Sequence, residues 1–272
     1  MPVTQIAVAS VTVPAQRELL STGDALRLEG VSRSFGALQA VDDVSFSVAA
    51  GGRRAVIGAN GAGKTTLFNV ITGDYAASAG RVRFFGEDVT TYAPFERIRA
   101  GMRRTYQSSL LFRNLSVRDN LYLAVRGVSR NRFSFLRSRP NRVTDDILER
   151  VRLSHIAGEL VASLSHGQQR QLEIGMALAG APRLILFDEP AAGLSPAERR
   201  ELVALLIALP AHMGYIIIEH DLDVALRVVE RVTVMHNGRV LKHGTPAEIE
   251  GDAEVQAIYI GRFRSPLGGS HH

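Results

Sequence analysis

The chain has 272 residues with 32 basic and 27 acidic side chains, a formal net charge of +5, and a length that suits one large domain or a domain with a subdomain. It contains no cysteine, which excludes disulfide bonds, thiolate metal sites and cysteine nucleophiles. No apolar run approaches the roughly 20 residues of a membrane-spanning helix. The positive charge suits a nucleic acid partner, an anionic lipid surface or simply a basic proteome, and it does not choose among them.

The first predicted strands follow an N-terminal segment without regular periodicity. Residues 1–23 lack a basic region ahead of their apolar stretch, because the first arginine is Arg17. We therefore expect a flexible tail rather than a secretory signal. Beyond it, Leu26–Leu28 and Val44–Val48 alternate apolar and polar residues, as half-buried antiparallel strands do. Phe35 lies between them, and its spacing alone predicts a core position.

The stretch Gly58–Thr66 fits the phosphate-binding loop G-x-x-x-x-G-K-[ST]. Its glycines permit close approaches that side chains would block, so that backbone N–H groups form a nest for phosphate oxygens. Lys64, one of only two lysines in the chain, is expected to reach the β- and γ-phosphates, and the Thr65 hydroxyl to bind Mg²⁺. A strand ending at Ala55–Ile57 and a helix over Thr65–Thr72 complete the pattern, since a helix N-terminus favours an anion. The predicted nucleotide-binding residues of the loop are Gly58, Ala59, Asn60, Gly61, Ala62, Gly63, Lys64, Thr65 and Thr66.

The middle of the chain changes from strand-forming to helix-forming patterns. Val82–Phe85 predicts a strand, and a short helix is expected over Pro94–Ala100. Between residues 110 and 162, Ser116 marks a capped helix start, and the apolar spacing from Val143 to Val151 is helical.

Six arginines and two phenylalanines are interleaved from Arg126 to Arg142. A solvated basic loop explains this composition. A surface that meets protein or anionic headgroups explains it as well, and we expect the stretch to strengthen docking at a membrane. The residues are Arg126, Arg130, Arg132, Phe133, Phe135, Arg137, Arg139 and Arg142.

Two continuous apolar runs, Leu184–Phe187 and Tyr215–Ile218, are typical of parallel strands covered by helices on both faces. The predicted helix Pro196–Leu209 lies between them and makes a βαβ unit. A hairpin around Asn237-Gly238 is expected over residues 232–241.

Polar residues follow both apolar strands, at the edge where parallel sheets bind ligands. Asp188 and Glu189 follow the first strand, and His220 follows the second. Asp188 is expected in the Mg²⁺ shell, and Glu189 is expected to polarise an attacking water. The alternatives are a solvated acidic turn and a structural histidine.

The string Leu164–Gln168 opens a predicted helix that runs to Ala179. Ser165 and the amides after Gly167 predict a second phosphate site at a helix N-terminus. An ordinary polar N-cap is the alternative.

These motifs occur in a fixed order along the chain. They are Gly58–Thr66, Gln107 within Arg104–Gln107, Leu164–Gln168, Leu184–Glu189 and His220. Together, over about residues 24–262, they resemble the ATP-binding subunits of ABC transporters. The resemblance implies an α/β fold: a P-loop ATPase core with a mixed, largely parallel sheet, an antiparallel β subdomain and an α-helical subdomain.

The resemblance also implies roles for the site residues and implies ATP and Mg²⁺ as ligands. Phe35 matches the aromatic residue that stacks on adenine, which replaces its expected place in the core. Gln107 matches the glutamine that senses Mg²⁺ and the membrane subunit. Glu189 matches the general base of hydrolysis, and His220 the residue that contacts the γ-phosphate. The implied metal ligands are Thr65, Gln107 and, through water, Asp188.

The string after Leu164 matches the signature that closes on ATP bound to the opposite subunit. Its implied residues are Ser165, His166, Gly167 and Gln168. The implied partners are a second ATPase subunit, identical or different, transmembrane permease subunits and, indirectly, a solute-binding protein. No nucleic acid partner is expected.

Further details are similar to the importers of branched-chain amino acids and the related urea and amide importers. His166 stands where many family members have glycine. Ala192–Pro196, Thr245–Ile249 and Ile258–Gly261 complete the pattern. Ser195 replaces the usual aspartate, which puts that carboxylate's cross-subunit contact in doubt.

The resemblance implies a peripheral protein on the cytoplasmic face of the cell membrane. The expected division is a tail over residues 1–23, an ATPase core over 24–108 and 163–248, a helical subdomain over 109–162 and a C-terminal extension over 249–272. A single-unit ABC ATPase engaged in soluble assembly or nucleic-acid work is the alternative function. The importer-like tail disfavours assembly, and one loop in 272 residues disfavours the fused nucleic-acid type.

Overall fold

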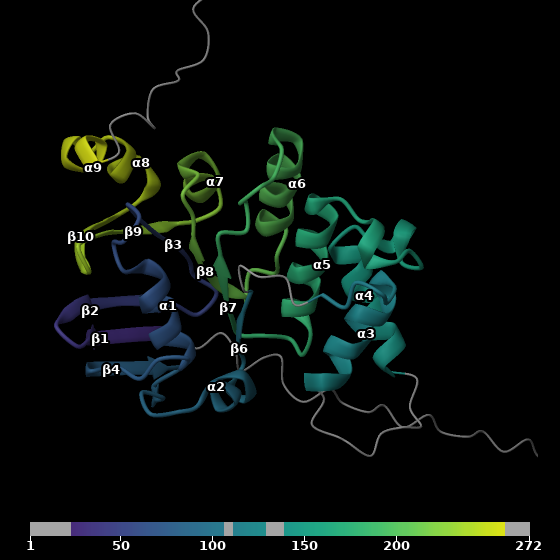
Figure 1. The fold of residues 1–272 in the computed structure, drawn as a ribbon, viewed down its shortest axis with the longest axis horizontal. Coiled ribbons are helices and arrows are strands. Elements are labelled where there is room, and N and C mark those ends of the chain that lie inside the picture. The colour runs from purple at the N-terminus through teal and green to yellow at the C-terminus, as the bar shows by residue number, and fades with distance from the viewer. Residues whose placement is uncertain (1–22, 106–110, 129–138, 259–272) are drawn as a thin grey trace, which may run out of the picture.

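The computed structural model describes residues 23–105, 111–128 and 139–258 (Figure 1). Gln107, Phe133 and Phe135 lie outside the described residues, as does the N-terminal segment before Gly23. Within the described ranges, no helix is both long enough and apolar enough to cross a membrane.

An antiparallel sheet occupies the N-terminal part of the described chain. Its strands are β1 (Asp24–Phe35), β2 (Leu38–Ala49), β4 (Ala79–Phe84) and β5 (Glu87–Asp88). They lie in the order β2-β1-β4-β5. The predicted alternation is confirmed, because Leu26 and Leu28 are buried while Arg27 between them is exposed.

A second sheet carries the motifs of the candidate site. Its strands are β3 (Arg53–Gly58), β6 (Met102–Arg104), β7 (Leu184–Asp188), β8 (Gly214–Ile218), β9 (Arg231–His236) and β10 (Arg239–Gly244). They lie in the order β10-β9-β3-β8-β7-β6, and all neighbours pair in parallel except β10 with β9. The mixed sheet and the closing hairpin are therefore confirmed, and so is the βαβ unit in which the helix α6 (Pro196–Ile207) connects the parallel strands β7 and β8.

Helices cover this second sheet on both faces. The helices of the described residues are α1 (Lys64–Thr72), α2 (Pro94–Ala100), α3 (Val117–Val128), α4 (Arg139–Arg150), α5 (His166–Leu178), α6 (Pro196–Ile207), α7 (Leu222–Arg227), α8 (Pro246–Glu250) and α9 (Ala253–Ile258). Two 3₁₀ turns, Ser154–Ile156 and Val161–Ser163, lie between α4 and α5. Figure 1 shows α3 and α4 beyond α5, on the side of the molecule away from the antiparallel sheet.

The buried side chains form two clusters, one on each face of the second sheet. Leu186 of β7 and Ile216 of β8 join α1 and the antiparallel sheet in one cluster. Their neighbours Phe187 and Ile217 face the other cluster, which contains residues of α3 to α7. This alternation explains why β7 and β8 read as continuous apolar runs, since both of their faces are buried.

The helix after residue 138 differs in one respect from the predicted stripe. Val143 is 41% exposed and lies outside the core. The buried positions are instead Thr144, Ile147, Leu148 and Val151. Their spacing of three and four residues keeps them on one face of a helix with 3.6 residues per turn. The predicted stripe of Val143, Ile147 and Val151 uses two steps of four residues, which drift away from that face.

The described ends of the basic stretch are helical rather than part of a loop. Arg126 lies within α3, and Arg142 lies within α4. The other arginines and both phenylalanines of that stretch fall on residues 129–138, outside the described structure, or at Arg139, the first residue of α4.

Candidate nucleotide-binding site

The phosphate loop connects the end of β3 to the start of α1. Gly63 has a φ of 94°, and a Cβ placed on it would lie 2.3 Å from the carbonyl oxygen of Ala40. A Cβ on Gly58 would lie 2.4 Å from the carbonyl oxygen of Met235. Any side chain at either position would therefore collide with backbone that cannot move aside, which gives a physical reason for both glycines.

The loop presents its backbone to solvent while holding its lysine close. Ala59, Asn60, Gly61 and Thr65 are exposed. Lys64 is 5% exposed, and its Nζ donates hydrogen bonds to the carbonyl oxygens of Gly58, at 2.8 Å, and Ala59, at 3.0 Å. The ammonium group is thus held at the loop, at the start of a helix whose N-terminus attracts anions.

Asp188 is a buried carboxylate at the end of β7. Its Oδ2 accepts a hydrogen bond from Arg104 Nη2 at 2.7 Å, and its backbone N–H donates to Thr105 Oγ1 at 3.3 Å. Its other oxygen, Oδ1, is buried without a hydrogen-bond partner in the part of the chain that the structure describes. Since buried polar atoms are rarely left unsatisfied, this oxygen suits a hydrated cation.

Arg104 joins Asp188 to the end of α1. Its Nη1 donates to Asn69 Oδ1 at 2.5 Å and to Asp74 Oδ2 at 3.2 Å. The side chains of Arg104 and Asp188 are 6% and 2% exposed, so this ion pair is shielded from water. No role for Arg104 is predictable from the sequence, because an arginine of β6 gives no local sign of partners in α1 and β7.

Glu189 and His220 meet at the same edge of the sheet. Asp188 of β7 is paired with Ile218 of β8, so the residues that follow these strands emerge side by side. Glu189 Oε1 lies 2.5 Å from His220 Nε2. Glu189 also has a φ of 49°, a left-handed conformation that costs a non-glycine residue energy and that clusters at functional sites. The predicted proximity of the two residues is confirmed.

Glu219 is a buried acid that none of the sequence motifs singles out. It is 3% exposed, and its carboxylate accepts hydrogen bonds from the backbone N–H groups of Ala191, at 2.6 Å, and His220, at 3.2 Å. Burial raises the pKa of Glu219 to about 7, although the backbone N–H groups of Ala191, Asp221 and His220 act in the opposite direction. Its position directly after a buried strand and before His220 was the sequence signal that could have placed it at this edge of the sheet.

The signature string forms a capped helix start. Ser165 is the N-cap of α5, and Gln168 returns its side chain to the Ser165 backbone N–H in a reciprocal capping box. His166 is exposed. Ser165 and Gly167 contact Glu198 of α6 rather than the phosphate loop. The polar N-cap is therefore present, and it does not exclude a phosphate site, because both use the same orphan N–H groups.

Phe35 is on the surface and not in the core. It is 40% exposed, which overturns the position expected from its spacing alone. Its ring centroid lies 5.3 Å from that of Tyr75, edge to face, and the Arg33 guanidinium carbon lies 4.5 Å from the centroid. An exposed, anchored ring of this kind can stack on a planar ligand.

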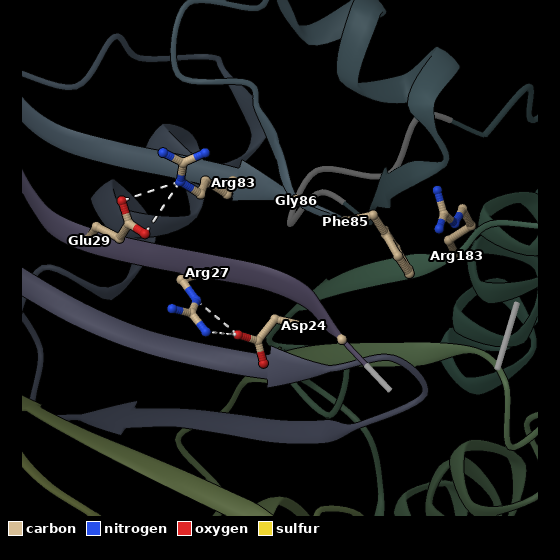
Figure 2. A pocket seen from close by; sticks show the side chains of 8 residues that line it. Asp24, Arg27, Glu29, Arg83, Phe85, Gly86 and Arg183 are labelled. Carbon is tan, nitrogen blue, oxygen red and sulfur yellow. Dashed lines mark hydrogen bonds and ion pairs between the residues drawn. The ribbon is translucent and has the colours of Figure 1, made fainter. Parts of the chain in front are cut away.

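The antiparallel sheet carries a separate pocket, shown in Figure 2, that lacks the loop and strand-end residues. Arg27 pairs with Asp24 at 2.7 Å. Arg83 pairs with Glu29 at 3.3 Å. Because none of the residues that line it belongs to the phosphate loop or follows β7 or β8, we assign the pocket no part in the nucleotide site.

Over residues 41–192 the chain matches the family described as ABC transporter. The chain belongs to the ABC transporter family. It is 34% identical to the high-affinity branched-chain amino acid transport ATP-binding protein BraF of Pseudomonas aeruginosa, covering 87% of this chain and 97% of that one. It is also 34% identical to the probable branched-chain amino acid transport ATP-binding protein LivG of Methanocaldococcus jannaschii, covering 88% and 98%. A probable ABC transporter ATP-binding protein of Azorhizobium caulinodans is 35% identical, covering 85% and 81%.

Solved structures agree with this assignment. A nucleotide-free ATP-binding cassette from an ABC transporter has a TM-score of 0.79 and 34% identity, covering 88% of this chain and 100% of that one. The ADP conformation of an ATP-binding cassette of an ABC transporter has a TM-score of 0.77, the same identity and the same coverage. The expected ABC-type ATPase fold is confirmed, and the chain is a nucleotide-binding ABC ATPase.

Proposed function

We propose that this ABC ATPase binds ATP with Mg²⁺ at Gly58–Thr66 and hydrolyses it to energise an importer of branched-chain amino acids. The observation that carries the hydrolytic part is the edge of the sheet after β7 and β8, where Glu189 meets His220 at 2.5 Å beside the buried Asp188. The importer part is supported by BraF and LivG, which share about a third of their residues with this chain over nearly their whole length.

The residues divide the chemistry of hydrolysis among them. The loop N–H groups and Lys64 hold the phosphates, and Phe35 stacks on the base. Thr65, Gln107 and, through water, Asp188 would hold Mg²⁺, which when bound neutralises charge on the β- and γ-phosphates. Glu189 orients the attacking water and accepts its proton. His220, held at 2.5 Å from Glu189, contacts the γ-phosphate and fixes the direction of that carboxylate.

The signature residues Ser165, His166, Gly167 and Gln168 serve a second copy or a related subunit. The support is that α5 begins with a helix N-terminus of the phosphate-binding kind while the chain has one phosphate loop. In this proposal ATP joins two subunits. Light scattering on the Glu189→Gln variant should show a heavier species with ATP than with ADP, and equal masses would contradict a closed dimer of identical subunits.

The membrane partners of the proposed complex are permease subunits fed by a solute-binding protein, which places the chain on the cytoplasmic face. Exposed apolar side chains that precede and follow residues 106–110 in the sequence support a docking surface for these subunits. Phe95 and Ile98 of α2 precede that segment, and Phe112 and Leu123 follow it. The division into a core of residues 24–108 and 163–248, a helical subdomain of 109–162 and a C-terminal extension of 249–272 is part of the same proposal.

The test of the hydrolytic role is Glu189→Gln, which keeps the shape of the side chain and removes its basicity. ATP affinity should stay near that of the parent, measured with a fluorescent ATP analogue. The steady-state rate of phosphate release should fall by about 10²- to 10⁴-fold, the usual contribution of a positioned base. Glu201→Gln, an exposed position on α6, is the matched control. An unaltered rate in Glu189→Gln would remove Glu189 from the role.

The test of the importer role is uptake of labelled leucine into vesicles that hold this subunit and its permease partners. Uptake should require ATP inside the vesicles and should be lost with Glu189→Gln. Failure of the subunit to co-purify with any membrane protein would favour the non-transport alternative.

A further inference from the structure

Glu198, which lies in the first turn of α6, places its carboxylate at the start of the signature helix. Its Oε1 accepts a hydrogen bond from the backbone N–H of Gly167 at 2.9 Å and lies 3.2 Å from Ser165 Oγ. Both groups belong to Ser165 and Gly167, two of the signature residues that the proposed function assigns to the opposite subunit's ATP. A carboxylate of the same chain therefore already accepts hydrogen bonds from both of them.

The contact is built into the start of α6 and is not a chance surface approach. Ser195 is the N-cap of α6, and Glu198 Oε2 accepts a hydrogen bond from the Ser195 backbone N–H at 2.9 Å. One carboxylate therefore bridges the first turns of two helices. The hydrogen bonds from Ser195, Gly167 and Ser165 lower the pKa of Glu198 to about 2, so the group is ionised throughout the physiological range.

The Glu198 carboxylate leaves no room for a side chain at position 167. A Cβ on Gly167 would lie 2.6 Å from Glu198 Oε1 and 2.7 Å from its Cγ. Gly167 is buried although Ser165 and His166 before it are exposed, and Glu198 supplies the nearest atoms around it.

A bound phosphate and this carboxylate compete for the same donors. A backbone N–H offers one hydrogen, and two anions that share it also repel one another at a separation of a few ångströms. Closure of the dimer must therefore either move Glu198 away from Gly167 or overcome the repulsion between its carboxylate and the phosphate.

We propose that the Glu198 carboxylate occupies the hydrogen-bond donors that would otherwise bind the γ-phosphate. Glu198 thereby sets the ATP concentration at which two subunits close. This inference rests on the proposed function, because it takes the start of α5 as the site of the opposite subunit's ATP. It adds a residue of α6 to that site and states the direction of its effect, because the carboxylate opposes closure of the dimer.

The variant Glu198→Gln tests the sign without removing the helix cap. Glutamine at the third helical position completes a capping box as glutamate does, and Gln168 does so in α5 of this structure. The substitution therefore removes the charge and keeps the cap. Glu201→Gln removes the same charge from an exposed site on the same helix, and so controls for net charge.

The experiment measures dimer formation by light scattering on the full chain, with Mg²⁺, across a series of ATP concentrations in a Glu189→Gln background. Glu198→Gln should lower the midpoint by about fivefold to tenfold, the factor that separates a charged from a neutral hydrogen-bond acceptor. Glu201→Gln should leave it unchanged. The unfolding temperature of each variant is recorded alongside, and since damage to the fold weakens dimerisation, a lower midpoint cannot arise from instability.

The outcomes separate this inference from the proposed function. If the background variant dimerises with ATP and Glu198→Gln leaves or raises the midpoint, the carboxylate does not oppose closure and the inference alone is wrong. If dimers form only when Glu198→Gln is added, the inference is supported. If no variant dimerises at any ATP concentration, the closed dimer of identical subunits is wrong, and the inference about its closure is wrong with it.

Discussion

Glu219 makes the stability of this ATPase depend on pH in a direction that can be calculated. Its carboxylate is 3% exposed, and burial raises its pKa from 4.5 to about 7 in the folded chain. Between these two values the folded state binds more protons than the unfolded state. The free energy of unfolding must therefore fall as pH rises through this window, and the contribution of Glu219 is complete only below the unfolded pKa.

The size of the effect follows from the shift in pKa. Each unit corresponds to about 1.4 kcal/mol, so a shift from 4.5 to about 7 gives a loss of about 3 kcal/mol between pH 4.5 and pH 8. The hydrogen bonds from Ala191 and His220 already oppose the desolvation of this carboxylate, so this figure is the balance of the two effects.

Urea denaturation at several pH values, on the parent and on Glu219→Gln, measures this loss. Glutamine does not titrate. The free energy of unfolding of the parent, relative to that of the variant, should therefore be highest at pH 4.5 and should fall by about 3 kcal/mol by pH 8. The difference between the two proteins cancels the titration of the histidines and of exposed acids. A difference that is independent of pH, or that grows as pH rises, would refute the argument that burial governs this carboxylate.

Three further predictions concern an ion pair, which is compared with an exposed control pair, a helix cap and a loop glycine. Arg104→Met should lower the free energy of unfolding by about 3 to 5 kcal/mol in urea denaturation, because it leaves the buried Asp188 carboxylate without its ion-pair partner; Arg27→Met, at a pair where the arginine is 56% exposed, should cost less than about 1 kcal/mol. Ser195→Ala should lower it by about 1 kcal/mol through the loss of an N-cap, and phosphate release should stay within about tenfold of the parent. Gly63→Ala should abolish binding of a fluorescent ATP analogue, since its Cβ would lie 2.3 Å from the Ala40 carbonyl oxygen; normal binding would contradict the loop geometry.

Features that depend on local sequence were predictable. The phosphate loop, the short helix Pro94–Ala100 and the hairpin around Asn237-Gly238 follow from residues that are neighbours in the chain. The burial of β7 and β8 on both faces was visible as two runs without polar alternation. From these, the meeting of the two strand ends could be predicted as well.

Features that depend on distant partners were not predictable. Arg104 is 84 positions from Asp188, and Glu198 is 31 positions from Gly167. Neither residue has a neighbour in the sequence that reveals its partner, although Ser195 three positions before Glu198 does predict the capping box. The spacing of Phe35 alone predicts a core position, because a periodic pattern cannot show that β1 ends at the surface there; the family resemblance, and not the spacing, predicts a ring free to stack on adenine.

The segment from Glu189 to Ser195 is held by packing and by two carboxylates. Ala191 and Leu194 are buried in the core, whereas Ala192 and Gly193 between them are exposed. Glu219 accepts the N–H of Ala191 near one end, and Glu198 accepts the N–H of Ser195 at the other. Turns and helix starts leave backbone N–H groups without partners, and a carboxylate with two oxygens can satisfy several of them. The same two acids reach His220 and Gly167, so the residues around Glu189 and the start of α5 are held by shared hydrogen bonds.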